Sequence, residues 1–112
     1  MTYAKAVAAL LALAAAGAVA AQPVDEGKKV YESACVTCHG ANGKGALPGV
    51  PDFTKKGGVL SQPDALLLKR VTEGFQSPGS PMPMPPKGGN ASLTDAQLRA
   101  SIQYIRQAFG AQ

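Results

Sequence analysis

The sequence predicts an all-α domain in which three to four short helices are joined by long, irregular loops. Three stretches place apolar residues at helical spacing next to helix-start or helix-stop signals. The intervening stretches are rich in glycine and proline, which supply 13 and 9 of the 112 residues. No stretch alternates between apolar and polar residues as a half-buried strand does. The domain is therefore expected to be built of helices and loops.

Residues 1–21 are predicted to be a secretory signal peptide that is removed from the protein. Lys5 gives this segment a basic start, an apolar run follows, and small residues precede the expected cleavage after Ala20 or Ala21. The apolar run is shorter than the roughly 20 residues that cross a bilayer, and most of it is alanine. We therefore expect residues 22–112 to form one exported, periplasmic domain without a membrane span.

The charge of the chain argues against nucleic-acid binding. The formal net charge is +4, from 11 basic and 7 acidic residues. Lys5 would leave with the signal peptide, so 10 basic side chains would face 7 acidic ones in the remaining domain. Nucleic-acid binding favours clustered Arg and Lys with stacking aromatic residues, and an exported protein rarely meets nucleic acid.

The first helix is predicted over residues 25–35. Two acidic residues lie in its first turn, near the positive end of the helix dipole. Gly27, Tyr31 and Cys35 recur every four residues, so they share one face. This spacing indicates a helix.

A second helix is predicted after the glycine- and proline-rich loop of residues 40–60. Ser61 can accept hydrogen bonds from first-turn amides, and Pro63 is tolerated in a first turn. Gly74 is a stop signal, and residues 75–90 then form another loop dominated by proline and glycine. The apolar face of this helix consists of Leu66, Leu67, Leu68 and Val71.

The last helix has the strongest signals. Thr94 and Gln97 have the spacing of a capping box, and Leu93 and Leu98 have that of a hydrophobic staple. Gly110 is expected to end the helix. Its apolar face consists of Leu98, Ile102, Ile105 and Phe109.

The run of residues 35–39 carries the chemistry. Its pattern is Cys-x-x-Cys-His, in which the thiols of Cys35 and Cys38 can add to the two vinyl groups of one haem while His39 binds the iron. A domain this small, with few large apolar residues, usually needs stabilisation beyond its own core. A disulfide between cysteines so close in sequence closes too small a loop to supply much. A buried, covalently attached haem c would supply it.

Three other uses of the cysteines compete with haem attachment. A thiol–disulfide redox site is expected in a βαβ frame, and no strands are predicted here. A zinc site needs a second pair of ligands, but the chain has no other cysteine or histidine. An inert disulfide would leave the position of His39 unexplained. Haem attachment is therefore the prediction.

The second axial ligand must be something other than histidine, or be missing, because His39 is the only histidine. A thioether sulfur is a soft donor that favours ferrous iron and raises the reduction potential. Met82 and Met84 are the candidates, and the prolines around them stiffen the loop that would hold a sulfur over the iron. The residues alone do not choose between them, and a five-coordinate iron is the remaining alternative.

The sequence resembles the class I cytochromes c of the small, monohaem bacterial type. The resemblance runs from about residue 25 to residue 109. It rests on the attachment run at 35–40, the Met-Pro-Pro-Lys-Gly segment at 84–88, and the closing helix with Tyr104. It implies the cytochrome c fold around one haem. It also implies an electron carrier rather than an enzyme, which could be the electron-accepting subunit of a dehydrogenase or oxidase.

The resemblance implies roles for single residues. Met84 would be the distal ligand, with Met82 as the fallback. The carbonyl of Pro51 would accept a hydrogen bond from the ring N–H of His39 and fix its orientation, with Pro48 as the rival.

Further expectations concern packing and partners. Gly27 and Tyr31 would cross the last helix near Tyr104 and Ile105. Apolar side chains would exclude water from the haem: Leu47, Val50, Phe53, Leu67, Leu68, Val71, Leu98 and Ile102. Lysines in the loops would steer an acidic-faced redox partner toward the haem edge: Lys44, Lys55, Lys56 and Lys87.

Two functions of other classes compete with electron carriage. A haem-based gas or redox sensor would need a labile sixth site on the iron. An exported Cu(I) carrier would use the soft ligands Cys35, Cys38, His39, Met82 and Met84.

Overall fold

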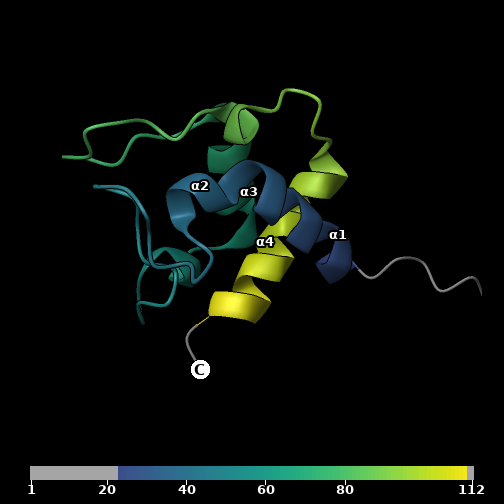
Figure 1. Cartoon of the computed structure of the whole chain (residues 1–112), viewed down its shortest axis with the longest axis horizontal. Coiled ribbons are helices and arrows are strands. Elements are labelled where there is room, and N and C mark those ends of the chain that lie inside the picture. Colours follow the sequence, from purple (N-terminus) through teal and green to yellow (C-terminus); the bar gives the residue numbers. More distant parts are fainter. Residues whose placement is uncertain (1–22, 111–112) are drawn as a thin grey trace, which may run out of the picture.

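The structure, a computed structural model, describes residues 23–110, so the predicted signal peptide lies outside the described residues. Figure 1 shows helices α1 and α4 crossing at one side of the molecule, α3 packed against α4, and two long loops extending away from the helices. The helical elements are α1 (Pro23–Val30), the π-helical turn η1 (Tyr31–Cys35), α2 (Val36–His39), the 3₁₀ turn η2 (Val59–Ser61), α3 (Asp64–Glu73), the 3₁₀ turn η3 (Pro86–Gly89) and α4 (Asp95–Phe109).

The all-α prediction is confirmed. The described residues form no strand, and their only extended pairing is an isolated antiparallel bridge between Phe75 and Met84. The buried core is small: Val30, Leu93 and Leu98 form a cluster on which Leu68 and Val71 pack. This small cluster does not fill the space between the helices and the two long loops.

The first helix is longer than predicted, because its helical path continues past Cys35 to His39. The turn η1 is π-helical, and the N–H of Val36 donates to the carbonyl of Tyr31, five residues earlier. Gly40 then ends α2 at a φ of 84°, a conformation that favours glycine. The predicted end of the helix at Cys35 was therefore wrong. The chain stays helical through α2, because a π turn widens a helix without ending it.

The predicted start of the second helix was wrong at Ser61. Its hydroxyl donates to the carbonyl of Gly58 at 2.5 Å, beside the main-chain bonds of the turn η2, and does not cap α3. The N-cap of α3 is Pro63, and the helix begins at Asp64. Gly74 is the C-cap, as predicted.

The capping box of α4 is confirmed by both of its hydrogen bonds. The Gln97 N–H donates to Thr94 Oγ1 at 3.1 Å, and the Thr94 N–H donates to Gln97 Oε1 at 2.9 Å. Leu93 and Leu98, the predicted staple, are both buried. Local signals therefore fix the start of this helix.

Gly27 lets α1 and α4 touch through their backbones. A Cβ at this position would overlap the carbonyl of Ala100, which excludes any side chain there. One turn further along, the ring of Tyr31 contacts those of Tyr104 and Phe109 at centroid distances of 5.5 and 5.4 Å. The predicted contact between Tyr31 and Tyr104 is confirmed, whereas Gly27 meets Ala100 rather than the turn that holds Tyr104.

We predict that Tyr31→Phe lowers stability and changes its pH dependence. The buried Tyr31 hydroxyl donates to the Gly40 carbonyl at 2.5 Å and anchors the end of α2. Its loss should cost about 1 kcal/mol at neutral pH. Burial, the largest cause, raises the pKa of Tyr31 from 10.0 to about 12.

A raised pKa means that this stabilisation is complete below pH about 10 and is lost as the pH rises through about 12. Denaturant unfolding at pH 7 and at pH 11–12 measures both effects. The variant should lose less stability than the wild type over that alkaline interval; an equal loss would contradict the role given to Tyr31.

Candidate functional site

A cavity of about 510 Å³ lies between the helices and the two long loops. Every helical segment except α1 contributes to its lining, and most of the lining side chains are apolar. Its volume is within the range of about 300–1,000 Å³ typical of ligand pockets. The cavity is therefore the candidate site.

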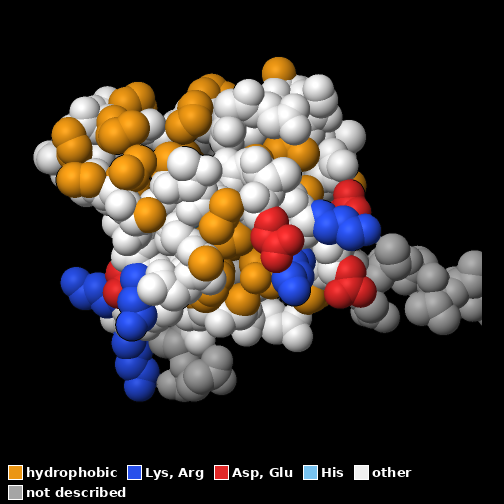
Figure 2. Space-filling model, viewed as in Figure 1, with side chains coloured by type: hydrophobic (Ala, Val, Ile, Leu, Met, Phe, Trp, Pro, Cys, Tyr) orange, Lys and Arg blue, Asp and Glu red, His pale blue; other side chains and the backbone are white. Residues whose placement is uncertain are grey.

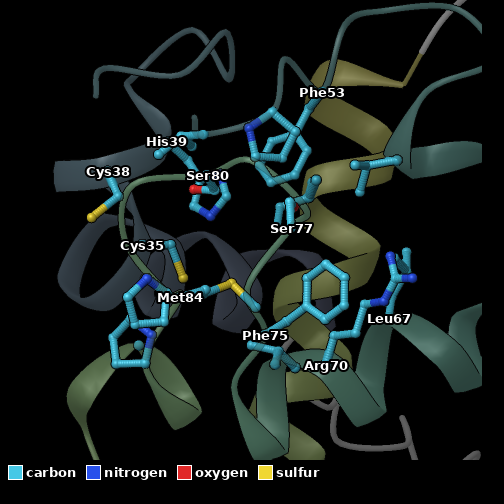
Figure 3. A pocket seen from close by; sticks show the side chains of 18 of the residues that line it. Cys35, Cys38, His39, Phe53, Leu67, Arg70, Phe75, Ser77, Ser80 and Met84 are labelled. Carbon is cyan, nitrogen blue, oxygen red and sulfur yellow. The ribbon is translucent and has the colours of Figure 1, made fainter. Parts of the chain in front are cut away.

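The predicted attachment run lies on one wall of this cavity. Cys35 ends η1, and Cys38 and His39 belong to α2, so one continuous helical path presents all three. Figure 3 shows Cys35 and His39 pointing into the same space, with Cys38 beside them. Both cysteines are free thiols, so the structure does not contain the disulfide considered as an alternative.

The imidazole of His39 is held in place by stacking. Its ring lies on that of Phe53 with a centroid distance of 4.5 Å and an interplanar angle of 14°. Phe53 is in turn fixed by a hydrogen bond from its N–H to the Gly43 carbonyl at 2.8 Å. Burial lowers the pKa of His39 from 6.5 to about 4, so the ring is neutral at physiological pH. A neutral imidazole is the form that binds a metal.

The Cys35 thiol lacks the character of a redox-active cysteine. Burial, and then the adjacent Cys38, raise the pKa of Cys35 from 9.0 to about 11. Reactive Cys-x-x-Cys sites instead lower the thiol pKa, because the thiolate is the nucleophile. The surroundings of the motif therefore oppose the thiol–disulfide alternative.

Both candidate methionines line the cavity, and Met84 alone of the two pairs its backbone with that of Phe75, whereas the Met82 carbonyl accepts a hydrogen bond from Ser80 Oγ at 3.0 Å. The Met84 N–H donates to the Phe75 carbonyl at 2.7 Å, and the Phe75 N–H donates to the Met84 carbonyl at 3.0 Å. In Figure 3 the thioether of Met84 points into the space that His39 faces. Met82 lies further along the loop and is 45 % exposed. This difference favours Met84, the residue that the resemblance implies as the ligand, over Met82.

Pro51 lines the cavity, whereas Pro48 does not. Among the described residues the buried Nδ1 of His39 has no hydrogen-bond partner, so no bond joins it to the Pro51 carbonyl. The pairing of these two residues stays a prediction.

The predicted apolar wall is correct in part. Val50, Phe53, Leu67, Val71 and Ile102 line the cavity as expected. The other three do not: Leu47 is 37 % exposed, Leu98 is buried in the core and Leu68 packs against that core.

Sequence reasoning missed two lining residues with unusual surroundings, Arg70 and Phe75. The Arg70 guanidinium lies over the Phe75 ring, with its Cζ 4.0 Å from the ring centroid. Both residues line the cavity. A basic residue at the end of a helix and an aromatic residue after its cap are common on surfaces, so no sequence pattern points to the pair.

The donor set and the shape of the cavity fit a covalently bound haem. Two thiols and a neutral imidazole lie on one wall, a thioether points in from another segment, and apolar side chains surround them. Among the described residues no three His, Cys, Asp or Glu side chains gather as ligands for a bare metal ion.

Comparison with known proteins agrees with this site. The family model for cytochrome c matches residues 24–109. The chain belongs to the cytochrome c family. As a cytochrome c, it binds haem c covalently and carries electrons rather than transforming a substrate. The predictions of family, cofactor and electron transfer are therefore confirmed, and the Cu(I) carrier is not supported.

Two relatives and one solved structure are similar to this cytochrome c over most of their length. Cytochrome c-555 of Chlorobaculum tepidum is 35 % identical over 94 residues, which cover 84 % of each chain. Cytochrome c-555 of Prosthecochloris aestuarii is 36 % identical over 81 residues, covering 70 % of this chain and 81 % of the relative. A chain in the crystal structure of an electron-transfer complex of nitrite reductase with cytochrome c matches with a TM-score of 0.56 and 35 % identity. The match covers 74 % of this cytochrome and 93 % of that chain.

The helices of the described part are too short or too polar to cross a membrane.

Proposed function

We propose that this cytochrome c is an exported carrier of single electrons whose haem is attached to Cys35 and Cys38 and whose iron is bound by His39 and Met84. The observation that carries the proposal is that one cavity is lined by all four of these residues. Bound haem supplies a one-electron ferric/ferrous couple, and a thioether ligand favours the ferrous state.

The chain supports that couple by holding its ligands still and keeping water away. His39 is stacked on Phe53 and is neutral, and Met84 is held by its backbone bridge to Phe75. Apolar side chains from α3 and α4 complete the walls. Rigid ligands and dry walls limit the rearrangement that accompanies each electron. Export to the periplasm follows from the signal peptide predicted over residues 1–21.

We predict that Met84→Ala abolishes the sulfur–iron absorption band of the ferric protein near the red end of the spectrum. Loss of the thioether should also lower the midpoint potential by a sizeable part of the ~0.8 V span that axial ligands control. Visible spectra and a redox titration of the holoprotein measure both changes.

The matched control is Met82→Ala, which removes the other methionine of the same loop. Met82 is more exposed and makes no backbone bridge to Phe75, so band and potential should stay close to wild type. A band that survives Met84→Ala but disappears in Met82→Ala would reverse the assignment. A band absent from the wild type would favour a haem sensor with an open sixth site.

We further propose that the partners are redox proteins with an acidic face. Figure 2 shows several basic side chains around an acidic one at the lower left, and charged side chains of both signs at the centre and right, whereas the upper-left lobe is uncharged on this face. The loop segments 45–51 and 76–86, which line the cavity, contain no charged residue. Lysines would steer the approach, and these uncharged loops would make the contact. A similar structure is part of an electron-transfer complex with nitrite reductase, which supports a redox-protein partner.

Replacing Lys44 and Lys87 with Gln should weaken the salt dependence of electron exchange with an anionic probe. Oxidation of the ferrous protein by ferricyanide, followed by stopped flow at increasing NaCl, measures it. The wild-type rate should fall as salt screens the attraction, and the double variant should start lower and fall less. The control is Lys28→Gln, because Lys28 is exposed on α1, the helix that does not line the cavity. An unchanged salt dependence in the double variant would remove the steering role.

A further inference from the structure

The backbone of Phe75 sets the register of the loop that carries Met84. The two residues exchange both of their main-chain hydrogen bonds, at 3.0 and 2.7 Å. Gly74, the C-cap of α3, lets the chain turn directly from the helix into this pair at a φ of 82°. A Cβ at Gly74 would lie only 2.9 Å from the Met84 carbonyl oxygen, so the turn and the bridge are closely fitted.

The prolines of the loop leave few other ways to fix Met84. Residues 81, 83, 85 and 86 are prolines and have no N–H. Between residues 81 and 86 only Met82 and Met84 can therefore donate a main-chain hydrogen bond. The bridge to Phe75 uses the donor of Met84. The place of the Met84 side chain consequently depends on where Phe75 lies.

Phe75 is itself held by Arg70 on α3. The guanidinium Cζ lies 4.0 Å from the ring centroid. Figure 3 shows the ring between the side chains of Arg70 and Met84, and all three line the cavity. Arg70 forms no ion pair among the described residues. A partly buried guanidinium over an aromatic face contributes an attraction that fixes the position of the ring.

The helix behind this contact is anchored at its other end. Leu67 is buried, and Asp64 accepts a hydrogen bond from Arg106 Nε of α4 at 2.7 Å. Arg106 also donates to the carbonyls of Leu60 and Gln62, just before α3 begins. Arg70 therefore extends from a fixed helix, and its contact with Phe75 connects that helix to the methionine loop.

We propose that Phe75, clamped by Arg70, is a positioning residue that keeps the Met84 thioether directed at the iron; this inference rests on the proposed ligation by Met84. A thioether is a weak ligand, so its bond depends on how well the protein pre-organises it. Loosening the clamp gives the loop more states in which the sulfur lies off the iron. A small neutral ligand would then compete more effectively for the sixth position.

The test is a titration of the ferric holoprotein with imidazole, followed by loss of the sulfur–iron absorption band. Phe75→Leu keeps an apolar side chain and the main-chain bonds, and Arg70→Met keeps the length of the side chain. Each variant should bind imidazole about tenfold more tightly than wild type, because apparent affinity rises with the fraction of open molecules. The double variant should bind no more tightly than the tighter single one, as expected of two residues that act through one contact.

Two controls separate this role from general destabilisation. Lys69→Met removes the neighbouring exposed cation of α3 and should leave imidazole affinity unchanged. Phe75→Tyr keeps the aromatic ring and should restore wild-type affinity. Imidazole affinities of Phe75→Leu and Arg70→Met within about twofold of wild type would overturn the inference. So would an equal tightening in Lys69→Met.

The outcome is distinguishable from a failure of the proposed ligation. If Met84→Ala loses the band while the Phe75 and Arg70 variants behave as wild type, Met84 is the ligand and the clamp is wrong. If Met84→Ala keeps the band, the ligation is wrong, and the positioning role fails with it.

Discussion

Replacing Cys35 and Cys38 together with alanine is expected to give a chain from which acidified organic solvent removes all haem, and which then has no cooperative unfolding transition. The thioether bonds are the covalent link, so without them only coordination and packing retain the cofactor. At ~24 cal/mol per Å³ of cavity, an empty space of about 510 Å³ corresponds to a cost of at most about 12 kcal/mol. This upper bound is comparable to the whole stability of a small domain, about 5–15 kcal/mol, so the extracted chain should lose most or all of its stability and with it the cooperative transition.

Solvent extraction followed by thermal circular dichroism measures both parts of this result. Thr37→Ala is the matched control, because Thr37 is exposed between the cysteines and its loss keeps the Cys-x-x-Cys-His pattern. That variant should keep its haem through extraction and unfold cooperatively. A double-cysteine variant that retains haem after extraction would disprove attachment at these two residues.

Gly27→Val is expected to prevent the close crossing of α1 and α4. Any Cβ at Gly27 overlaps the Ala100 carbonyl and lies 2.9 Å from the Ser101 nitrogen, and neither backbone atom can move without shifting α4. α4 carries the buried Leu98 and Ile102, so the disturbance reaches the core and the cavity wall. We expect a loss of at least about 3 kcal/mol, at the upper end of overpacking effects.

The milder Gly27→Ala tests the sign of the effect. In an exposed helix this change would stabilise by about 1 kcal/mol, whereas here it should destabilise. Lys28→Val is the matched control, since it places the same β-branched side chain at the exposed neighbouring position of α1. Its cost should stay within about 1 kcal/mol. Denaturant unfolding of the holoproteins measures all three, and a Gly27→Ala protein at least as stable as wild type would contradict the close contact.

The sequence predicted those parts of the fold that depend on neighbouring residues. The capping box of Thr94 and Gln97 acts within one turn, and α4 begins where it indicates. The start of α3 was misplaced because Ser61 bonds back to Gly58 instead of forward into the helix. The end of the first helix was misplaced because a π turn has no distinct sequence signal. The predicted division of the chain at residue 21 lies outside the described residues.

The candidate site also has one part that neighbouring residues predict and another part that depends on tertiary contacts. Cys35, Cys38 and His39 are contiguous in sequence, so their pattern alone identified the chemistry. Met82 and Met84 each lie between two prolines, so their local sequences look alike. They differ because the backbone of Met84 pairs with that of Phe75, nine residues earlier in the chain. The contact of Arg70 with Phe75 likewise depends on how the chain leaves α3. Local sequence patterns identify the candidate ligand residues, and tertiary contacts determine how firmly each ligand side chain is positioned.

The central claim is that one haem is bonded to Cys35 and Cys38. Trypsin cleavage after Lys29 and Lys44 releases residues 30–44, which contain both cysteines and His39. The denatured digest of protein made in a host competent for cytochrome maturation can be weighed by mass spectrometry. The account predicts that this peptide is heavier than its bare sequence by the mass of one haem and absorbs visible light. A colourless peptide at its bare mass, with two free thiols, would contradict it.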